Sequence, residues 1–81
     1  MTISADRRDP TAIDVTFDDA AITVVLADGR EISAPLAWFP RLRDATPEQR
    51  RRWRVIGRGE GLHWADLDED VSVNALLGLP T

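Results

Sequence analysis

A regular alternation of apolar and polar side chains over residues 13–17, and again over residues 22–26, is the feature that most restricts how this chain can fold. An apolar residue at every second position is the pattern of a half-buried β-strand. The even-length connection over residues 18–21 then fixes the register of a hairpin. The pairs expected to share one apolar face are Phe17 with Ile22, Val15 with Val24 and Ile13 with Leu26.

The turn of a second hairpin contains Gly29, and its length can be inferred from charge. A two-residue loop would pair Leu26 with Glu31 and so place a carboxylate on the apolar face. A three-residue loop over residues 27–29 instead pairs Val24 with Ile32, provided that Gly29 adopts the left-handed conformation and a bulge follows it. We therefore expect the bulged, three-residue turn.

A capping box marks the start of a helix in the second half of the chain. Thr46 supplies the N-cap hydroxyl, Pro47 occupies the first helical position and Gln49 the third. We expect this helix to run from Pro47 to about Val55, because the glycines at positions 57, 59 and 61 then end it.

Short elements are expected on either side of that helix. The apolar residues at positions 38, 39 and 42 surround Pro40 and predict a short helical turn packed under the sheet. Residues 62–64 predict a further strand, and Asp70 or Ser72 is placed to cap a last short helix. The apolar stripe of this helix is Val73, Leu76 and Leu77.

These elements predict an α+β fold, namely a small antiparallel β-sheet with two short helices in the order β-β-β-α-β-α. The polar residues 1–11 are expected to form a flexible N-terminal arm, and residues 12–81 a single domain. A chain of 81 residues buries only about 60% of the surface that its unfolded form exposes, so we expect self-association or a partner to add stability.

The composition narrows the functional classes. Without cysteine the chain has no disulfide framework, no thiolate metal site and no cysteine nucleophile, and a cytoplasmic location fits best. No apolar run approaches the roughly 18 residues that cross a bilayer, so we expect no membrane insertion. His63 is the sole histidine and no residue is placed as its paired nucleophile. We therefore expect no enzymatic activity and no cofactor.

Two segments have the spacing of ligand-binding loops but lack the residues that such loops need. Residues 57–61 follow a helix and lack the Lys-Ser/Thr of a phosphate-binding loop, so we interpret them as a helix stop. Asp66, Asp68 and Asp70 have calcium-loop spacing, but the sixth and twelfth positions carry neither glycine nor glutamate. We interpret these acids as complementing the positive end of the dipole of the helix that follows them. The alternative is a weak metal site that includes His63.

Four arginines and Trp53 make up residues 50–54. Clustered arginines neutralise phosphates and an aromatic ring stacks on a base, so this segment is the candidate for nucleic-acid contact. The net charge of −4 opposes that function. Because four arginines in five residues cannot share one helix face, we expect Trp53 to face inward and some arginines to pair with the acids of residues 66–70. Nucleic-acid binding is not expected of the isolated domain.

Several motifs together resemble a family of small bacterial proteins, domain of unknown function 2442. The motifs are Asp28-Gly29-Arg30, Phe39-Pro40-Arg41-Leu42, Ala45-Thr46 with Glu48 and Arg50, Gly59-Glu60-Gly61-Leu62-His63-Trp64, Leu67-Asp68-Glu69-Asp70-Val71-Ser72 and Leu76-Leu77-Gly78. Ala65 departs from the family pattern, which often has proline after the tryptophan. The resemblance implies an α+β fold with a small antiparallel sheet and no established activity. Relatives are often encoded beside another small protein, an arrangement similar to a toxin–antitoxin pair.

Our hypothesis from these observations is a non-enzymatic protein-binding module, an antitoxin-like partner of a small neighbouring protein. A basic partner would suit the acidic net charge, and Trp and Arg are enriched at interface hot spots. The expected contact residues are Trp38, Phe39, Arg41, Arg50, Trp53, Arg54, His63, Trp64, Asp68 and Asp70. The alternatives are a homo-oligomer, a nucleic-acid-associated regulator that uses the Arg50–Arg54 helix, and a small-ligand or metal-binding domain around His63.

Overall fold

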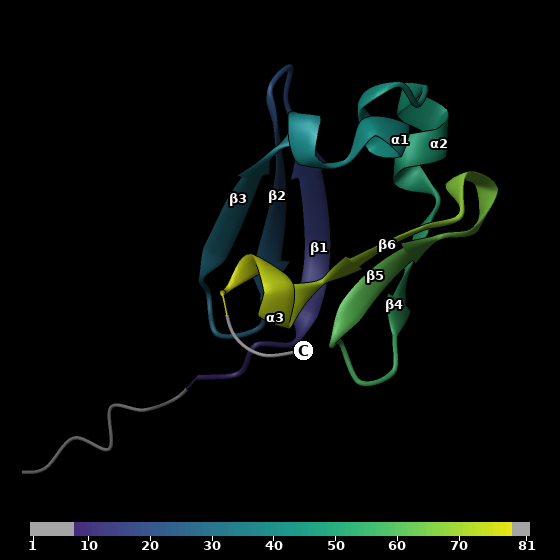
Figure 1. Ribbon diagram of the computed structural model, residues 1–81. Coiled ribbons are helices and arrows are strands. Elements are labelled where there is room, and N and C mark those ends of the chain that lie inside the picture. The colour runs from purple at the N-terminus through teal and green to yellow at the C-terminus, as the bar shows by residue number, and fades with distance from the viewer. Residues whose placement is uncertain (1–7, 79–81) are drawn as a thin grey trace, which may run out of the picture.

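Two antiparallel sheets of three strands each make up the protein in the computed structural model, which describes residues 8–78 (Figure 1). The expected α+β class is confirmed. The first sheet contains β1 (Ala12–Phe17), β2 (Ala21–Leu26) and β3 (Glu31–Pro35), and the second contains β4 (Trp53–Ile56), β5 (Gly61–Trp64) and β6 (Glu69–Ser72). The helical elements are η1 (Leu36–Trp38), α1 (Pro40–Arg43), α2 (Pro47–Arg51), η2 (Ala65–Leu67) and α3 (Val73–Leu76).

The first hairpin has the expected register except at its open end. Phe17 lies opposite Ile22 and Val15 opposite Val24, but Ala12 takes the place opposite Leu26 that we expected of Ile13. The register shifts between Ala12 and the residue after Ile13, so β1 carries a bulge there. One extra residue reverses the faces, and the side chain of Ile13 is consequently 54% exposed. The prediction that Ile13 lies on the apolar face is wrong.

The bulged turn of the second hairpin is confirmed. Val24 lies opposite Ile32, and Gly29 has a φ of 93°, in the left-handed region. The backbone N–H of Leu26 donates a 2.8 Å hydrogen bond to the carbonyl oxygen of Arg30 and closes the loop. This register keeps the carboxylate of Glu31 away from the apolar face.

The capping box at Thr46 is confirmed, but the helix that it begins is shorter than expected. The Thr46 hydroxyl accepts from the backbone N–H of Gln49, whose side chain accepts in return from the Thr46 N–H. Helix α2 ends at Arg51, and residues 53–56 form strand β4 instead of a further helical turn. The reason is tertiary pairing: Trp53 lies opposite Trp64 in the neighbouring strand β5, and this pairing outweighs helix propensity.

Around Pro40 the expected short helical turn exists as η1 followed by α1. Pro40 is the first residue of α1 and Leu42 is fully buried. Trp38, by contrast, is 67% exposed, so this aromatic residue does not pack under the sheet.

The C-terminal part contains the expected strand and helix together with one strand that the sequence did not indicate. Strand β5 covers the expected residues 62–64, and Ser72 caps α3 by accepting a 3.2 Å hydrogen bond from the Ala75 N–H. Asp70, the alternative cap, lies inside β6 and pairs with His63 across the sheet. The expected order β-β-β-α-β-α with two short helices therefore gains β4, β6 and a third short helix, α1.

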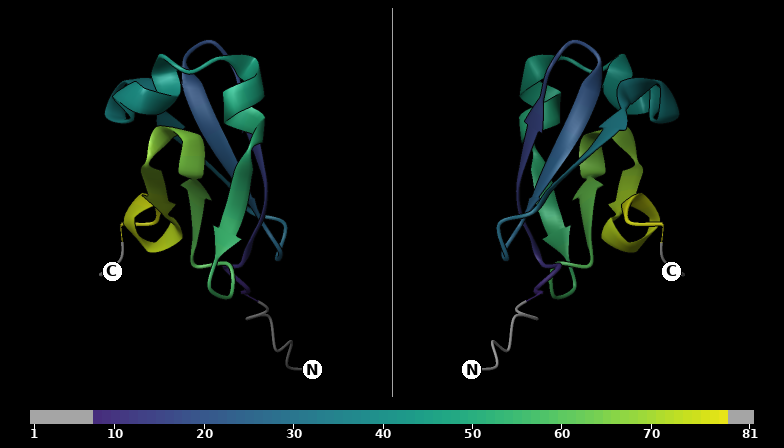
Figure 2. Two further views of the ribbon diagram at one scale, coloured as in Figure 1. Left: turned by 90° about the vertical axis from the view of Figure 1, so that its right-hand side faces the viewer. Right: turned by 90° about the vertical axis from the view of Figure 1, so that its left-hand side faces the viewer.

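The core lies between the two sheets, which face one another (Figure 2). The residues buried there are Ala12, Val15, Ile22, Val24, Leu26, Ala34, Leu36, Leu42, Leu62, Trp64, Val71 and Val73. Trp64 is the largest of them, and its indole meets the ring of Phe17 edge to face at a centroid distance of 6.3 Å. This contact joins the two sheets.

The turn between β4 and β5 is the second place where the sheets join. The backbone N–H of Ala12, at the start of β1, donates a 3.0 Å hydrogen bond to the carbonyl oxygen of Gly59. The N–H of Val73, at the start of α3, donates at 3.0 Å to the carbonyl oxygen of Glu60. One turn therefore anchors the first strand and the last helix.

Part of the predicted flexible arm is joined to the domain. The Asp9 N–H donates to the Asp28 carboxylate at 2.9 Å, and the Thr11 carbonyl oxygen accepts from the Ala27 N–H at 2.8 Å. The expectation of an unpacked arm is corrected for residues 9–11, while residues 1–7 lie outside the described part of the chain. Within residues 8–78, no helix is long and apolar enough to cross a membrane.

Candidate protein-binding surface

Arg50 is partly buried, and its side chain is held by contacts within the fold. Its Nε donates to the Leu42 carbonyl oxygen and its Nη2 to the Arg43 carbonyl oxygen, each at 2.9 Å. Its guanidinium carbon lies 5.1 Å from the centre of the Phe17 ring, within the range of a cation–π contact. The Arg50 carbonyl oxygen also accepts from Nε1 of Trp64 at 3.0 Å. This expected contact residue therefore serves the fold.

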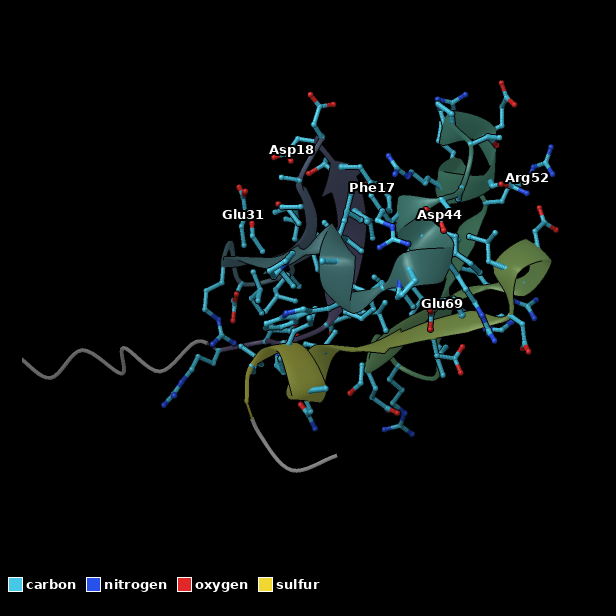
Figure 3. The ribbon with its side chains drawn as sticks, turned by 45° about the horizontal axis from the view of Figure 1, so that its top comes forward. Phe17, Asp18, Glu31, Asp44, Arg52 and Glu69 are labelled. Carbon is cyan, nitrogen blue, oxygen red and sulfur yellow. The ribbon has the colours of Figure 1, made fainter. Side chains whose placement is uncertain are left out.

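Two other arginines are paired with the acidic segment that follows β5. Arg52 lies 2.9 Å from the Asp66 carboxylate, which confirms the expected pairing of the two charged segments. Arg41 donates to the Asp68 carbonyl oxygen at 2.6 Å and lies 3.9 Å from its carboxylate. Figure 3 shows Arg52 pointing outward from the body of the protein. Both pairs are exposed, so each contributes at most about 1 kcal/mol to stability.

Three other arginines near β4 are exposed and differ from Arg41 and Arg52 in having no paired carboxylate within the described residues. Arg51 ends α2, Arg54 lies within β4 and Arg58 lies in the turn after it, and all three are exposed. Within the part of the chain that the structure describes, none of their side chains makes an ion pair or hydrogen bond. Their charge is therefore directed to solvent.

A cross-strand row of charged groups occupies the outer face of the second sheet. Arg54 in β4 lies opposite His63 in β5, which lies opposite Asp70 in β6. Nδ1 of His63 forms a short hydrogen bond with the Asp70 carboxylate. Residues 8–78 bring no three His, Asp or Glu side chains together in a group that could hold a metal ion.

The same face has a shallow depression two residues further along the strands. There Ile56, Gly61 and Ser72 lie opposite one another, and the central glycine has no side chain. An open pocket of about 250 Å³ results, lined also by Glu60, Asp70 and Val71. A Cβ atom at Gly61 would lie 2.9 Å from the Val71 carbonyl oxygen, so a side chain there would displace the neighbouring strand. The outer face, defined here as Arg54, Ile56, Gly61, His63, Asp70 and Ser72, thus combines an apolar depression with a polar rim.

A second hollow lies between the end of β1 and α2. This cleft of about 370 Å³ has Val15 and Phe17 on its floor, with acids on one side and arginines on the other. Asp18, which points outward from the β1–β2 turn in Figure 3, accepts hydrogen bonds from the N–H groups of Ala20 and Ala21. These two bonds lower the pKa of the Asp18 carboxyl group. The acidic side of the cleft therefore stays charged to a lower pH than an ordinary aspartate would.

The expected contact residues do not form one surface. Trp53 is partly buried against the core, in agreement with the expectation that it faces inward, and Trp64 is fully buried, so these two expected contact residues offer little surface to a partner. Trp38 and Phe39 lie beside α1, which Figure 2 shows on the far side of the molecule from β4. Of the expected set, Arg54, His63 and Asp70 do lie together.

Sequence reasoning missed the exposed apolar residues of β4. Val55 and Ile56 are 40% and 38% exposed, but both fell inside or beside the expected helix. The signal that could have located them is the close spacing of Gly57, Gly59 and Gly61, which suits a hairpin turn as well as a helix stop. Gly57 and Gly59 both have positive φ in this turn.

The family model described as "Protein of unknown function (DUF2442)" matches residues 12–79, in agreement with the resemblance found in the motifs. No curated protein matched the chain.

Two solved structures are similar in fold and in sequence. The crystal structure of a protein of unknown function from Rhodospirillum rubrum is 29% identical with a TM-score of 0.68, over 89% of this chain and 90% of that one. The solution structure of an uncharacterised protein from Chromobacterium violaceum is 31% identical with a TM-score of 0.69. That alignment covers 84% of this chain and 64% of the other, so this chain spans about two thirds of the second relative.

Proposed function

The chain belongs to the DUF2442 family, and we propose that it is a non-enzymatic protein-binding domain that uses the outer face of its second sheet. The observation that supports this proposal is the apolar depression at Gly61, with the exposed Ile56 beside it and Arg54, His63 and Asp70 at its rim. Protein interfaces commonly have this organisation, an apolar centre with a polar surround. An anchor side chain of a partner would fill the depression.

The charge distribution refines the kind of partner. A net charge of −4 favours long-range attraction of a basic protein, as an antitoxin-like domain would need for a small basic neighbour. Around β4, however, the local charge is positive. A partner that is basic overall would be attracted by the net negative charge, and an acidic segment of that partner would match the positive charge around β4. The lack of cysteine fits a reducing compartment, so we place this interaction in the cytoplasm.

The test compares two exposed isoleucines. Ile56→Ser removes the apolar wall of the depression, and Ile13→Ser makes the same change on β1, where the side chain is 54% exposed. The tagged full chain is used to capture binding proteins from nuclease-treated extracts of its own host, and the affinity of each purified binder is then measured. We expect Ile56→Ser to weaken binding by about 2 kcal/mol, roughly a thirtyfold rise in Kd.

The control variant, Ile13→Ser, separates loss of the depression from loss of any exposed isoleucine. Ile13→Ser should leave Kd within about twofold, because isolated surface substitutions rarely exceed 0.5 kcal/mol. Thermal unfolding of both variants verifies that the fold persists. Equal loss of binding in the two variants, or no captured protein with the unmodified chain, would contradict the proposed function.

A further inference from the structure

The outer edge of β4 carries no neighbouring strand within residues 8–78. Strand β4 is the end strand of the sheet, so one side of its backbone presents N–H and C=O groups without a ladder partner. Val55 and Ile56 on this strand are 40% and 38% exposed. The edge therefore offers backbone hydrogen bonds and apolar contact to the same occupant.

Three exposed arginines lie before, within and after this strand. Arg51 precedes β4, Arg54 lies within it and Arg58 follows it. Among the described residues these are the arginines near β4 whose charge no carboxylate neutralises, whereas Arg52 is paired with Asp66. A strand added here would have an arginine near its start, its middle and its end.

A second copy of the chain is a poor occupant of this edge. In antiparallel pairing, residues that lie directly opposite share a face, so a symmetric β4–β4 pair would be centred on one of residues 53–56. With the centre at Trp53, Arg54 or Ile56, Arg54 comes opposite an arginine of the second copy; with the centre at Val55 it comes opposite Ile56 and finds no carboxylate. Like charges directly opposite each other are destabilising. The edge thus disfavours self-pairing and is suited to a partner of opposite charge.

We propose that an extended acidic segment of a partner protein adds to β4 as a fourth, antiparallel strand of the second sheet. This inference rests on the proposed function and specifies the chemistry of the partner. The register requires a carboxylate opposite Arg54 on the outer face, and apolar side chains opposite Val55 and Ile56. Read in the direction of the partner chain, the segment has the order apolar, apolar, acidic.

Nucleic acid is the competing occupant. Phosphate groups would pair with Arg51, Arg54 and Arg58, but they would leave the free strand edge and the exposed Val55 unused. Trp53, the aromatic residue nearest to these arginines, is partly buried against the core and so is not available as a stacking platform. A protein strand uses all of these features together.

The experiment places a photo-reactive side chain at the edge of β4. Val55 is replaced with p-benzoylphenylalanine in the full chain, the protein is irradiated in host extract, and cross-linked peptides are sequenced by mass spectrometry. We expect cross-links to a segment of another protein with net negative charge and the order apolar, apolar, acidic. Cross-links to a basic segment, to a second copy or to nucleic acid would overturn the inference.

Charge reversal provides the matched comparison. The pair Arg54→Glu and Arg58→Glu should lower the cross-link yield by about tenfold or more, because carboxylates would then face carboxylates. The same change at one residue of α1, Arg43→Glu, is the control and should leave the yield unchanged. If the charge-reversed protein keeps its partner, the acidic strand is refuted while the proposed function stands. If the unmodified chain captures no protein, both are refuted.

Discussion

The indole Nε1 of Trp64 donates a 3.0 Å hydrogen bond to the carbonyl oxygen of Arg50, and the side chain of that arginine lies over Phe17. One residue of α2 thus meets the buried tryptophan with its backbone and the first sheet with its guanidinium. The two sheets and the helical segment between them are held by this arrangement. The first prediction concerns its loss.

Replacement of Arg50 with alanine should lower the free energy of unfolding by about 2 kcal/mol. The change leaves the Leu42 and Arg43 carbonyl oxygens without their charged donor and removes the cation–π contact. Urea unfolding followed by tryptophan fluorescence measures the effect. Arg51→Ala, one residue further along α2, should change stability by less than about 0.5 kcal/mol. Equal effects of the two substitutions would show that Arg50 does not hold the fold.

Two glycines with the same φ should respond differently to alanine. Gly29 and Gly59 both have φ of 93°, so each substitution carries the cost of a left-handed alanine, about 1 kcal/mol. Nothing lies within 4 Å of a Cβ at Gly29, whereas a Cβ at Gly59 would lie 2.2 Å from Cγ2 of Thr11. We expect Gly59→Ala to cost about 3 kcal/mol in total, because the start of β1 must move. Thermal unfolding of both variants measures the difference, and equal losses would contradict the close approach of Thr11.

Asp28 should make the protein sensitive to acid. The Arg30 backbone N–H is the largest cause that lowers the pKa of its carboxyl group, burial opposes it, and the Asp9 N–H and the Arg30 guanidinium lower it further. Since the folded pKa lies below the unfolded one, this stabilisation is complete above the unfolded value and is lost as the pH falls through the folded value.

Asp28→Asn tests that sign. The variant should unfold at a lower temperature than the unmodified protein at neutral pH, and the difference should shrink as the pH falls below the ordinary aspartate range, about pH 4. Melting temperatures recorded by circular dichroism from neutral to strongly acidic buffer check the trend. A difference that stays constant with pH would mean that the carboxylate charge of Asp28 does not stabilise the turn.

The sequence predicted the first sheet well because charge and periodicity there point to one register. A two-residue turn would place Glu31 on the apolar face, so the three-residue turn that pairs Val24 with Ile32 was favoured. Ile13 was misplaced because a bulge changes the face of one residue without changing the alternation of the sequence. The bulge is held in part by the hydrogen bond from the Ala12 N–H to Gly59 in the β4–β5 turn. A local sequence pattern does not contain this distant contact.

The second sheet was harder to predict because its strands are short and begin next to stronger local signals. The capping box at Thr46 and the arginines after it favour helix, and only the pairing of Trp53 with Trp64 shows where helix gives way to strand. The acidic residues before Ser72 are typical of the start of a helix, but Asp70 lies in strand β6. Both strands depend on partners distant in sequence, which a local pattern does not contain.

The candidate surface was predicted only in part, because it too depends on pairing between strands that are distant in sequence. Arg54, His63 and Asp70 were expected contact residues, but their alignment in one row follows from strand register. Tryptophan is common at interfaces, but Trp64 lies in the core, where its ring meets Phe17 and its Nε1 donates to the Arg50 carbonyl oxygen. Aromatic content alone does not separate these two roles.

The β4–β5 turn, which receives a hydrogen bond from Ala12 at Gly59 and another from Val73 at Glu60, brings the first strand and the last helix to adjacent residues. Proximity of this kind is what circular permutation requires. A short linker from the end of α3 to the start of β1, with a new opening between Asp18 and Ala20, would retain both three-stranded sheets. The connectivity of this small domain is therefore separable from its architecture, and permuted chains could present the outer face and the edge of β4 from new termini.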